Sequence, residues 1–106
     1  TSTPLNDAAE ATAISTVFKD SAPFVTGTKG VTGHSLGAAG AIEAVAVILS
    51  MVNKTIPLTH GTKNIDSDFD RLNLVYLDSV YWEPGPTISN SFGFGGHNGS
   101  IVFGPA

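Results

Sequence analysis

A cation and an imidazole lie five residues apart in the glycine-rich segment from Gly27 to Gly37. These residues are Lys29 and His34, and the segment leads directly into an apolar stretch that we expect to be helical. The start of a helix favours negative charge, so donors placed there can stabilise a developing oxyanion. A neutral His34 can donate a hydrogen bond to a carbonyl oxygen, and Lys29 can orient it. The alternative is a loop histidine that only caps the helix.

Glu43 is the only carboxylate in the apolar stretch that follows. A buried carboxylate is costly unless it is paired. Lys29 or a bound cation is therefore its expected partner. In the alternative interpretation, Glu43 lies on a single solvated edge of the helix.

A second glycine-rich segment, from Asn90 to Asn98, places Phe94 between two glycines. Glycines on both sides make Phe94 a movable aromatic on a flexible hinge. Such a residue can gate a hydrophobic channel. The alternative is a hairpin whose glycines serve only the geometry of the turn.

The segment Gly33–Gly37 also matches G-x-S-x-G, the nucleophile elbow of α/β-hydrolases, with Ser35 as the nucleophile. The order Ser, Asp, His is completed by His97 and one of four aspartates, Asp66, Asp68, Asp70 and Asp78. No strong apolar strand leads into this segment, and only 34 residues precede Ser35. The scheme also leaves Lys29 and Phe94 without a role, so we rank it below the oxyanion interpretation.

The composition limits the classes of function. The 106 residues fit one domain. The net charge is −4 and only five residues are Lys or Arg, which disfavours nucleic-acid binding. The chain has no cysteine, which excludes disulfides and thiolate metal sites. We expect no metal.

The charged fraction is 13%, against ~25% in typical soluble domains. This deficit suggests a surface that further chain or a second subunit covers, or else a core rich in alanine and glycine. The longest apolar stretch, Ala38–Val52, is too short to cross a bilayer. We therefore expect a soluble protein without a membrane span.

The pattern of apolar residues predicts an α/β fold. Helices are expected over residues 6–18, with Asn6 as the N-cap, and 36–52. The second helix is apolar on nearly all faces, so we expect it to be buried in a large core. Strands are expected over residues 24–26, 73–77, 87–92 and 100–103, and the last two should form a hairpin. Residues 80–82 are expected to extend the strand at 73–77, and residues 55–59 to be extended around Pro57.

Three segments resemble motifs of the β-ketoacyl-acyl-carrier-protein synthases, in the family's order. Lys29–Ala44 resembles K-x-x-x-G-H-x-x-G-A-A-G-x-x-E, and Asn90–Asn98 resembles N-S-F-G-F-G-G-x-N. Thr1–Glu10 resembles the end of H-G-T-x-T-P-x-x-D-x-x-E. The resemblance implies a thiolase-like fold, layered αβαβα in the complete enzyme. Residues 1–106 would form part of its C-terminal half, and a start at Thr1 without methionine fits a fragment.

The resemblance also implies decarboxylative Claisen condensation of a malonyl group with an acyl thioester, in fatty acid elongation. His34 would bind the malonyl thioester carbonyl and stabilise the enolate. Five further positions match functional residues of the family in the same way. They are Lys29 as the active-site lysine, Glu43 as its partner, Phe94 as the gate, and Thr1 and Thr3 as ligands of the pantetheine arm.

Parts of the family's catalytic apparatus are missing from this sequence. The first catalytic histidine would lie two residues before Thr1, and the nucleophilic cysteine belongs to the first half of the enzyme. The isolated chain should therefore be inactive. Ser2 stands where many members have glycine, and His97 where many have threonine.

The resemblance names partners as well. Acyl carrier protein would deliver both groups on its phosphopantetheine arm, so no separate cofactor is expected. The other partners would be the N-terminal half of the enzyme and, at full length, a second copy in a homodimer. The expected location is the cytoplasm, or a mitochondrion or plastid in a eukaryote. Synthases that make polyketides share these motifs and are an alternative, as is a non-catalytic piece that binds a partner half.

Overall fold

The polypeptide begins with a helix whose start is fixed by proline. The computed structural model describes residues 1–106, and its first helix, α1, spans Pro4–Phe18. Proline at the first helical position lacks only an N–H that would be unpaired there, so it suits a helix start. Asn6 therefore lies inside the first turn, and the expectation that it caps the helix is wrong. The end was predicted well, since Lys19 leaves the helix with φ of 49°.

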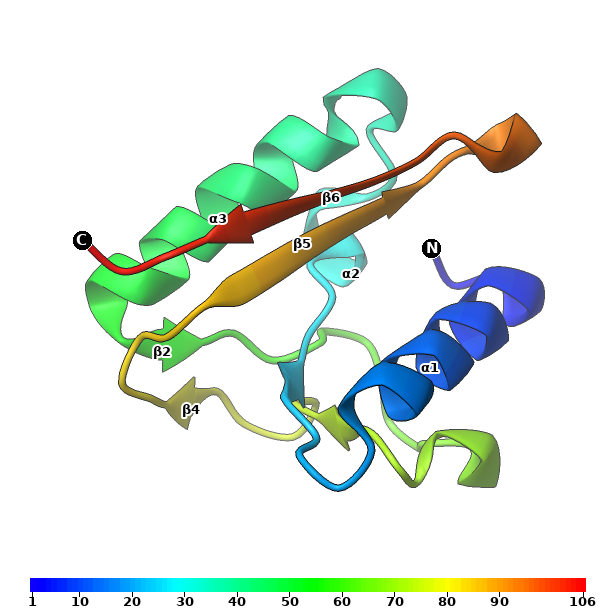
Figure 1. Ribbon diagram of the computed structural model, residues 1–106, viewed down its shortest axis with the longest axis horizontal. Coiled ribbons are helices and arrows are strands. Elements are labelled where there is room, and N and C mark those ends of the chain that lie inside the picture. Colours follow the sequence, from blue (N-terminus) through cyan, green and yellow to red (C-terminus); the bar gives the residue numbers. More distant parts are fainter.

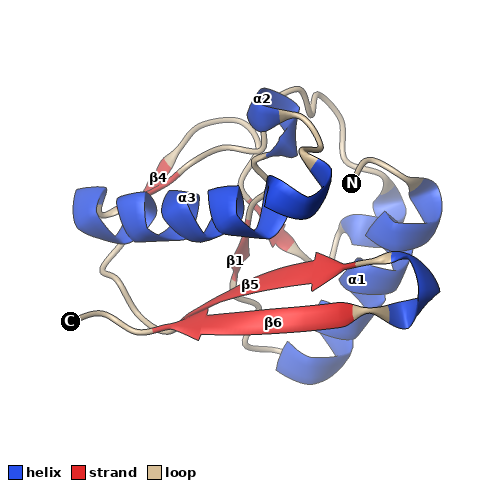
Figure 2. Ribbon diagram, turned by 90° about the horizontal axis from the view of Figure 1, so that it is seen from above, coloured by secondary structure: helices blue, strands red, loops and turns tan.

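Short helical turns replace much of the expected glycine-rich loop. After strand β1 (Phe24–Val25) comes a single helical turn, α2 (Lys29–Thr32). A 3₁₀ turn, η1 (Leu36–Ala38), then leads into the long helix α3 (Ala39–Asn53), which Lys54 ends in a left-handed conformation. In Figures 1 and 2, β1 lies between α1 and α3.

The strands form three separate two-stranded sheets. β1 pairs in parallel with β3 (Asn73–Leu74), and β2 (Thr55–Ile56) pairs antiparallel with β4 (Val80–Tyr81). The segment at 80–82 was expected to extend the strand at 73–77. That expectation is wrong, because the chain bends at Leu77 and Asp78 and joins β2 instead. Between the strands, the acidic stretch contains one 3₁₀ turn, η2 (Ser67–Phe69).

The C-terminal hairpin was predicted correctly. β5 (Thr87–Phe92) pairs antiparallel with β6 (Asn98–Phe103), in a register that joins Thr87 to Phe103 and Phe92 to Asn98. A short turn, η3 (Phe94–Gly96), connects them. Helix α3 runs along this hairpin and packs on β5 (Figures 1 and 2). Gly40 allows the approach, because a Cβ there would lie 3.3 Å from Ser91 Oγ.

The chain buries few of its apolar side chains. Only Ala11, Ile56 and Val75 are buried, and no residue of α3 is. The prediction that α3 lies inside a large core is wrong for these 106 residues, since no second layer covers its outer face. Val45 and Leu49 are more than half exposed, which favours a surface meant to be covered over an alanine- and glycine-rich core.

The helical segment Leu36–Asn53 corrects one further expectation. It has 18 residues and a mean hydropathy of 1.8, so by length and composition it is able to cross a membrane. The stretch counted from the sequence, Ala38–Val52, leaves out Leu36 and Gly37 at the start and Asn53 at the end. Core helices of soluble domains pass the same test when they are mostly buried, whereas this segment is 0% buried within the 106 residues. Glu43, in this helix, is paired with a residue outside it.

Candidate active site around His34

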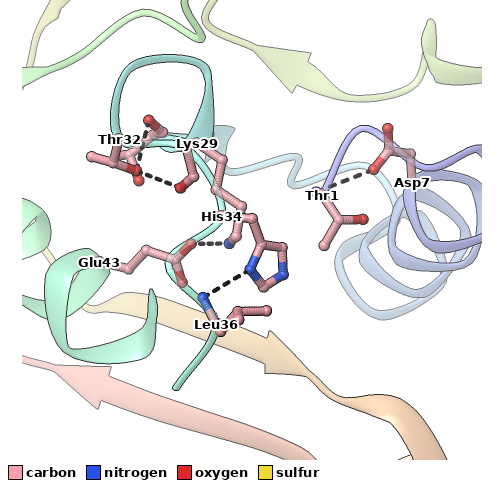
Figure 3. Close-up of polar contacts among 9 residues, drawn as sticks. Thr1, Asp7, Lys29, Thr32, His34, Leu36 and Glu43 are labelled. Atoms are coloured by element: carbon pink, nitrogen blue, oxygen red, sulfur yellow. Dashed lines mark hydrogen bonds and ion pairs between the residues drawn. The ribbon is translucent and has the colours of Figure 1, made fainter. Parts of the chain in front are cut away.

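The charged pair predicted from the sequence is present. Lys29 Nζ on α2 donates a hydrogen bond to Glu43 Oε1 on α3, across the turn that separates the two elements. The side chains are 25% and 16% exposed, so the pair is largely withdrawn from water. A partly buried carboxylate needs such a partner, and the pair fixes α2 against α3. Figure 3 shows His34 next to the pair.

The main chain determines which nitrogen of His34 can donate. The Leu36 backbone N–H donates to His34 Nδ1 over 3.1 Å (Figure 3). In the neutral ring, Nδ1 is then the acceptor and the proton resides on Nε2. His34 is exposed, so its Nε2–H group is available to an oxygen of a bound substrate.

The backbone around His34 has an unusual conformation. Gly33 has φ of 67° and ψ of 177°, a combination that is essentially restricted to glycine. Leu36 has φ of 50°, in the left-handed region, where a residue other than glycine is strained by about 1–2 kcal/mol. Together these two residues turn the chain so that the Leu36 N–H points back at the imidazole.

Glu10 is a residue of the site that the sequence reasoning left without a role. It lies on α1, and burial raises its pKa above the ordinary value. The Asn90 side chain, the N-terminal amine and Lys29 act on this pKa in the opposite direction, so Glu10 is within electrostatic reach of β5 and α2. The signal was present in the sequence, because Glu10 closes the D-x-x-E part of the first motif.

Thr1 and Thr3 lie at the start of α1. Their hydroxyl groups are 2.8 Å apart and hydrogen-bonded to each other, and both residues are exposed. The Thr1 amine is 3.5 Å from Asp7 Oδ1. Figure 3 shows Thr1 and Asp7 on the opposite side of the view from Lys29 and Glu43. Both hydroxyls are thus accessible to a ligand.

Phe94 stands apart from these residues at the tip of the β5–β6 hairpin. Its side chain is fully exposed, so it contacts none of Lys29, His34 and Glu43 in this chain. Gly95 and Gly96, with φ of 78° and 80°, follow it, and the Gly93 N–H donates to the His97 carbonyl over 2.9 Å to close the loop. The geometry is that of an aromatic carried on a glycine-rich tip, as the sequence indicated.

Ser35 lacks the surroundings of a nucleophile. Its Oγ is inaccessible to solvent and has no hydrogen-bond partner, so no imidazole is placed to activate it. In a nucleophile elbow the serine oxygen is exposed and is bonded to the catalytic histidine. The G-x-S-x-G match therefore does not correspond to a hydrolase site.

Comparison with known proteins assigns these features to one family. The model of the "Beta-ketoacyl synthase, C-terminal domain" matches residues 1–63, which is more than half of the chain. The chain therefore belongs to the β-ketoacyl synthase family and corresponds to a C-terminal part of it. This confirms the resemblance and the α/β fold class.

Relatives of this chain are named 3-oxoacyl-[acyl-carrier-protein] synthases. The chain is 47% identical to the mitochondrial 3-oxoacyl-[acyl-carrier-protein] synthase of Arabidopsis thaliana, over 97% of this chain and 23% of that protein. It is 41% identical to 3-oxoacyl-[acyl-carrier-protein] synthase 1 of Escherichia coli, over 96% of this chain and 25% of that protein. The chain thus spans about a quarter of the length of the curated relatives it matches.

A solved structure shares the fold. It is described as "The ishigamide ketosynthase/chain length factor", and it superposes on this chain with a TM-score of 0.92. The identity is 33%, and the match covers 98% of this chain and 26% of that one. The arrangement of α1, α3 and the β5–β6 hairpin is therefore that of the corresponding part of a ketosynthase.

The raised pKa of Glu10 leads to a pH-dependent prediction. We define the chimaeric synthase as the Arabidopsis protein in which this chain replaces the matching segment. Folding there binds the Glu10 proton more tightly, so stability falls as the pH rises from 4.5 through the folded pKa. Glu10→Gln removes this cost, so its melting temperature should exceed that of the parent at pH 7. The difference should vanish near pH 4.

Glu83 is the matched control for this prediction. Hydrogen bonds from Tyr81 and Lys54 lower its pKa, so its contribution to stability is present above 4.5 and is lost as the pH falls through the folded pKa. Glu83→Gln should therefore lower the melting temperature slightly at pH 7. Glu10→Gln and Glu83→Gln variants that shift the melting temperature in the same direction at pH 7 would contradict the assignment for Glu10.

Proposed function

We propose that this chain is the malonyl-binding and enolate-stabilising part of a 3-oxoacyl-[acyl-carrier-protein] synthase. The observation that carries the proposal is the state of His34, whose Nδ1 accepts from the Leu36 N–H while Nε2–H is free beside the Lys29–Glu43 pair. This arrangement is a preorganised neutral donor, which is what a developing oxyanion requires.

The proposed chemistry begins with the malonyl thioester. Its carbonyl oxygen accepts a hydrogen bond from His34 Nε2–H, and the bond between the α-carbon and the carboxylate breaks to release carbon dioxide. The electron pair passes into an enolate whose negative oxygen remains hydrogen-bonded to His34. The enolate carbon then attacks the acyl thioester on the cysteine of the remaining enzyme, and the cysteine thiolate leaves.

Lys29 and Glu43 support this step through their pairing. The carboxylate neutralises the lysine charge and fixes α2 on α3, so the turn that carries His34 keeps its place. Donors that are already oriented avoid the reorganisation that water would need, and this accounts for much of electrostatic catalysis. Both residues therefore act on His34 and on the charge around it.

The remaining assignments follow the family motifs. The exposed hydroxyls of Thr1 and Thr3 would hydrogen-bond the pantetheine arm, and Phe94 would gate the entry of the acyl chain. Both groups would arrive on acyl carrier protein, which removes the need for a separate cofactor. The rest of the synthase would cover the exposed face of α3, in a homodimer located in the cytoplasm or in an organelle.

Elongation of fatty acids is favoured over polyketide synthesis by the degree of similarity. The chain is 40–47% identical to several proteins named as 3-oxoacyl-[acyl-carrier-protein] synthases. Its identity to the ketosynthase/chain length factor is 33%. Both activities would use the same decarboxylation, so the site is common to them and the acyl substrate distinguishes them.

The test compares the isolated chain with the chimaeric synthase. The chimaeric synthase should condense malonyl- and acyl-carrier proteins to a β-ketoacyl product, because it restores the cysteine and the first histidine. The purified 106-residue chain should form none, since it has no cysteine to hold the acyl group. Product would be measured by mass spectrometry of the carrier protein. A chimaeric synthase that folds but does not decarboxylate the malonyl group would refute the proposal.

A further inference from the structure

The turn that carries Lys29 is attached to a segment remote in the sequence, Pro57–His60, which follows β2. Thr26 Oγ1 donates to the Pro57 carbonyl over 2.6 Å, and the Gly27 N–H donates to Thr59 Oγ1 over 3.1 Å. The Thr59 N–H in turn donates to the Val75 carbonyl over 2.7 Å. Thr59 thus joins the start of the site turn to the segment after β3.

The same segment touches the turn from the side. A Cβ added to Gly30 would lie 2.0 Å from the His60 carbonyl oxygen, so the two backbones are in direct contact there. The turn therefore has three points of attachment to Pro57–His60. They are the Thr26 hydroxyl at Pro57, the Thr59 hydroxyl at Gly27, and the backbone of His60 at Gly30.

Backbone hydrogen bonds connect the residues of the turn to one another. The Thr32 N–H donates to the Thr28 carbonyl over 3.1 Å, and the Gly33 N–H donates to the Lys29 carbonyl over 2.9 Å. Residues 28–33 therefore form one hydrogen-bonded unit that begins one residue after Gly27 and ends one residue before His34. We therefore expect a shift at Gly27 to displace Lys29 and His34 as well.

From this geometry we propose that Thr59 is a positioning residue for the condensation site. Its hydroxyl accepts from the Gly27 N–H, just before the unit that carries Lys29. That unit ends next to His34, so Thr59 acts through it and not by contact with the substrate. The proposal rests on the function proposed above for His34. Misplacement of a catalytic group by about 1 Å can cost ~10²-fold in rate even when its cause is remote.

The test uses Thr59→Val in the chimaeric synthase, because valine keeps the shape and removes the hydroxyl acceptor. Malonyl decarboxylation should fall at least ~10-fold in kcat. Transfer of the acyl group to the cysteine should remain within about twofold, since that step does not use His34. Thr59→Ser restores the acceptor and should return decarboxylation to within a few-fold of the parent.

A matched control removes a hydroxyl from the same part of the chain. The Thr55 hydroxyl donates only to the nearby Asn53 carbonyl, so Thr55→Val should change neither step. If Thr59→Val does not fold, Thr26→Val removes the neighbouring bond to Pro57 and takes its place in the same comparison.

A second readout does not depend on activity. Hydrogen exchange at the Gly27 amide should speed up in Thr59→Val and stay slow in Thr59→Ser, even in a chimaeric synthase without decarboxylase activity. An inactive chimaeric synthase would refute the function proposed for His34. The exchange rate of the Gly27 amide would still test whether Thr59 holds the turn. Unchanged Gly27 exchange, decarboxylation within twofold of the parent, or an equal loss of both catalytic steps would overturn the positioning role of Thr59.

Discussion

Replacement of His34 by alanine in the chimaeric synthase is expected to lower malonyl decarboxylation and condensation by ~10²–10³-fold, or about 3–4 kcal/mol. The loss follows from the removal of the Nε2–H donor at the oxygen where the enolate charge develops. Transfer of the acyl group to the cysteine should be spared, because it is expected to use a different set of donors. Separate assays of acyl transfer and carbon dioxide release measure the two steps.

A second substitution separates the donor from the shape of the side chain. His34→Gln places an amide N–H donor close to the position of Nε2 and should retain more decarboxylation than His34→Ala. Decarboxylation by His34→Ala within a few-fold of the parent would show that the role assigned to this histidine is wrong. An equal loss of acyl transfer would instead indicate general damage to the site.

Gly30→Ala is expected to disrupt the site although it removes no functional group. The new Cβ would lie 2.0 Å from the His60 carbonyl oxygen. The main chain fixes the position of both atoms, so neither can rotate away. Forced overpacking typically costs about 1–3 kcal/mol and sometimes more. Because Gly30 is adjacent to Lys29, the displaced backbone should also reduce decarboxylation by ~10²-fold. Thermal melting and the decarboxylation assay measure the two effects.

Gly85→Ala provides the comparison for this substitution. Gly85 has open space around the position of a Cβ and lies in the turn before β5, so alanine there should leave both measurements near those of the parent. A Gly30→Ala protein that melts and decarboxylates like the Gly85→Ala protein would show that the contact with His60 is not needed.

Local patterns in the sequence predicted the elements whose stability is local. The β5–β6 hairpin was expected because its two strands flank a glycine-rich turn, and the pairing is present. The pairing of Glu43 with Lys29 was expected because a lone carboxylate in an apolar helix requires a partner, and the ion pair is present. Their catalytic roles, and those of His34, Phe94, Thr1 and Thr3, stay predictions.

Several features were missed, one of them local and the others set by distant contacts. The cap at Asn6 was wrong because Pro4 starts α1 earlier, and the partner of residues 80–82 depends on a bend that periodicity does not reveal. The burial of α3 was wrong for this chain because burial requires covering layers that these residues do not supply. Glu10 was left without a role because its surroundings come from three elements far apart in the sequence.

The donor that fixes the His34 tautomer is a main-chain group, and this determines which residues position 36 is able to tolerate. The Leu36 side chain is largely exposed in this chain and takes no part in the bond to Nδ1. Glycine or asparagine would supply the same N–H and adopt φ near 50° more easily. Proline is the residue that is excluded, since it lacks the N–H and holds φ near −65°. Residues other than proline can therefore replace Leu36 in the course of evolution while the proton of neutral His34 stays on Nε2.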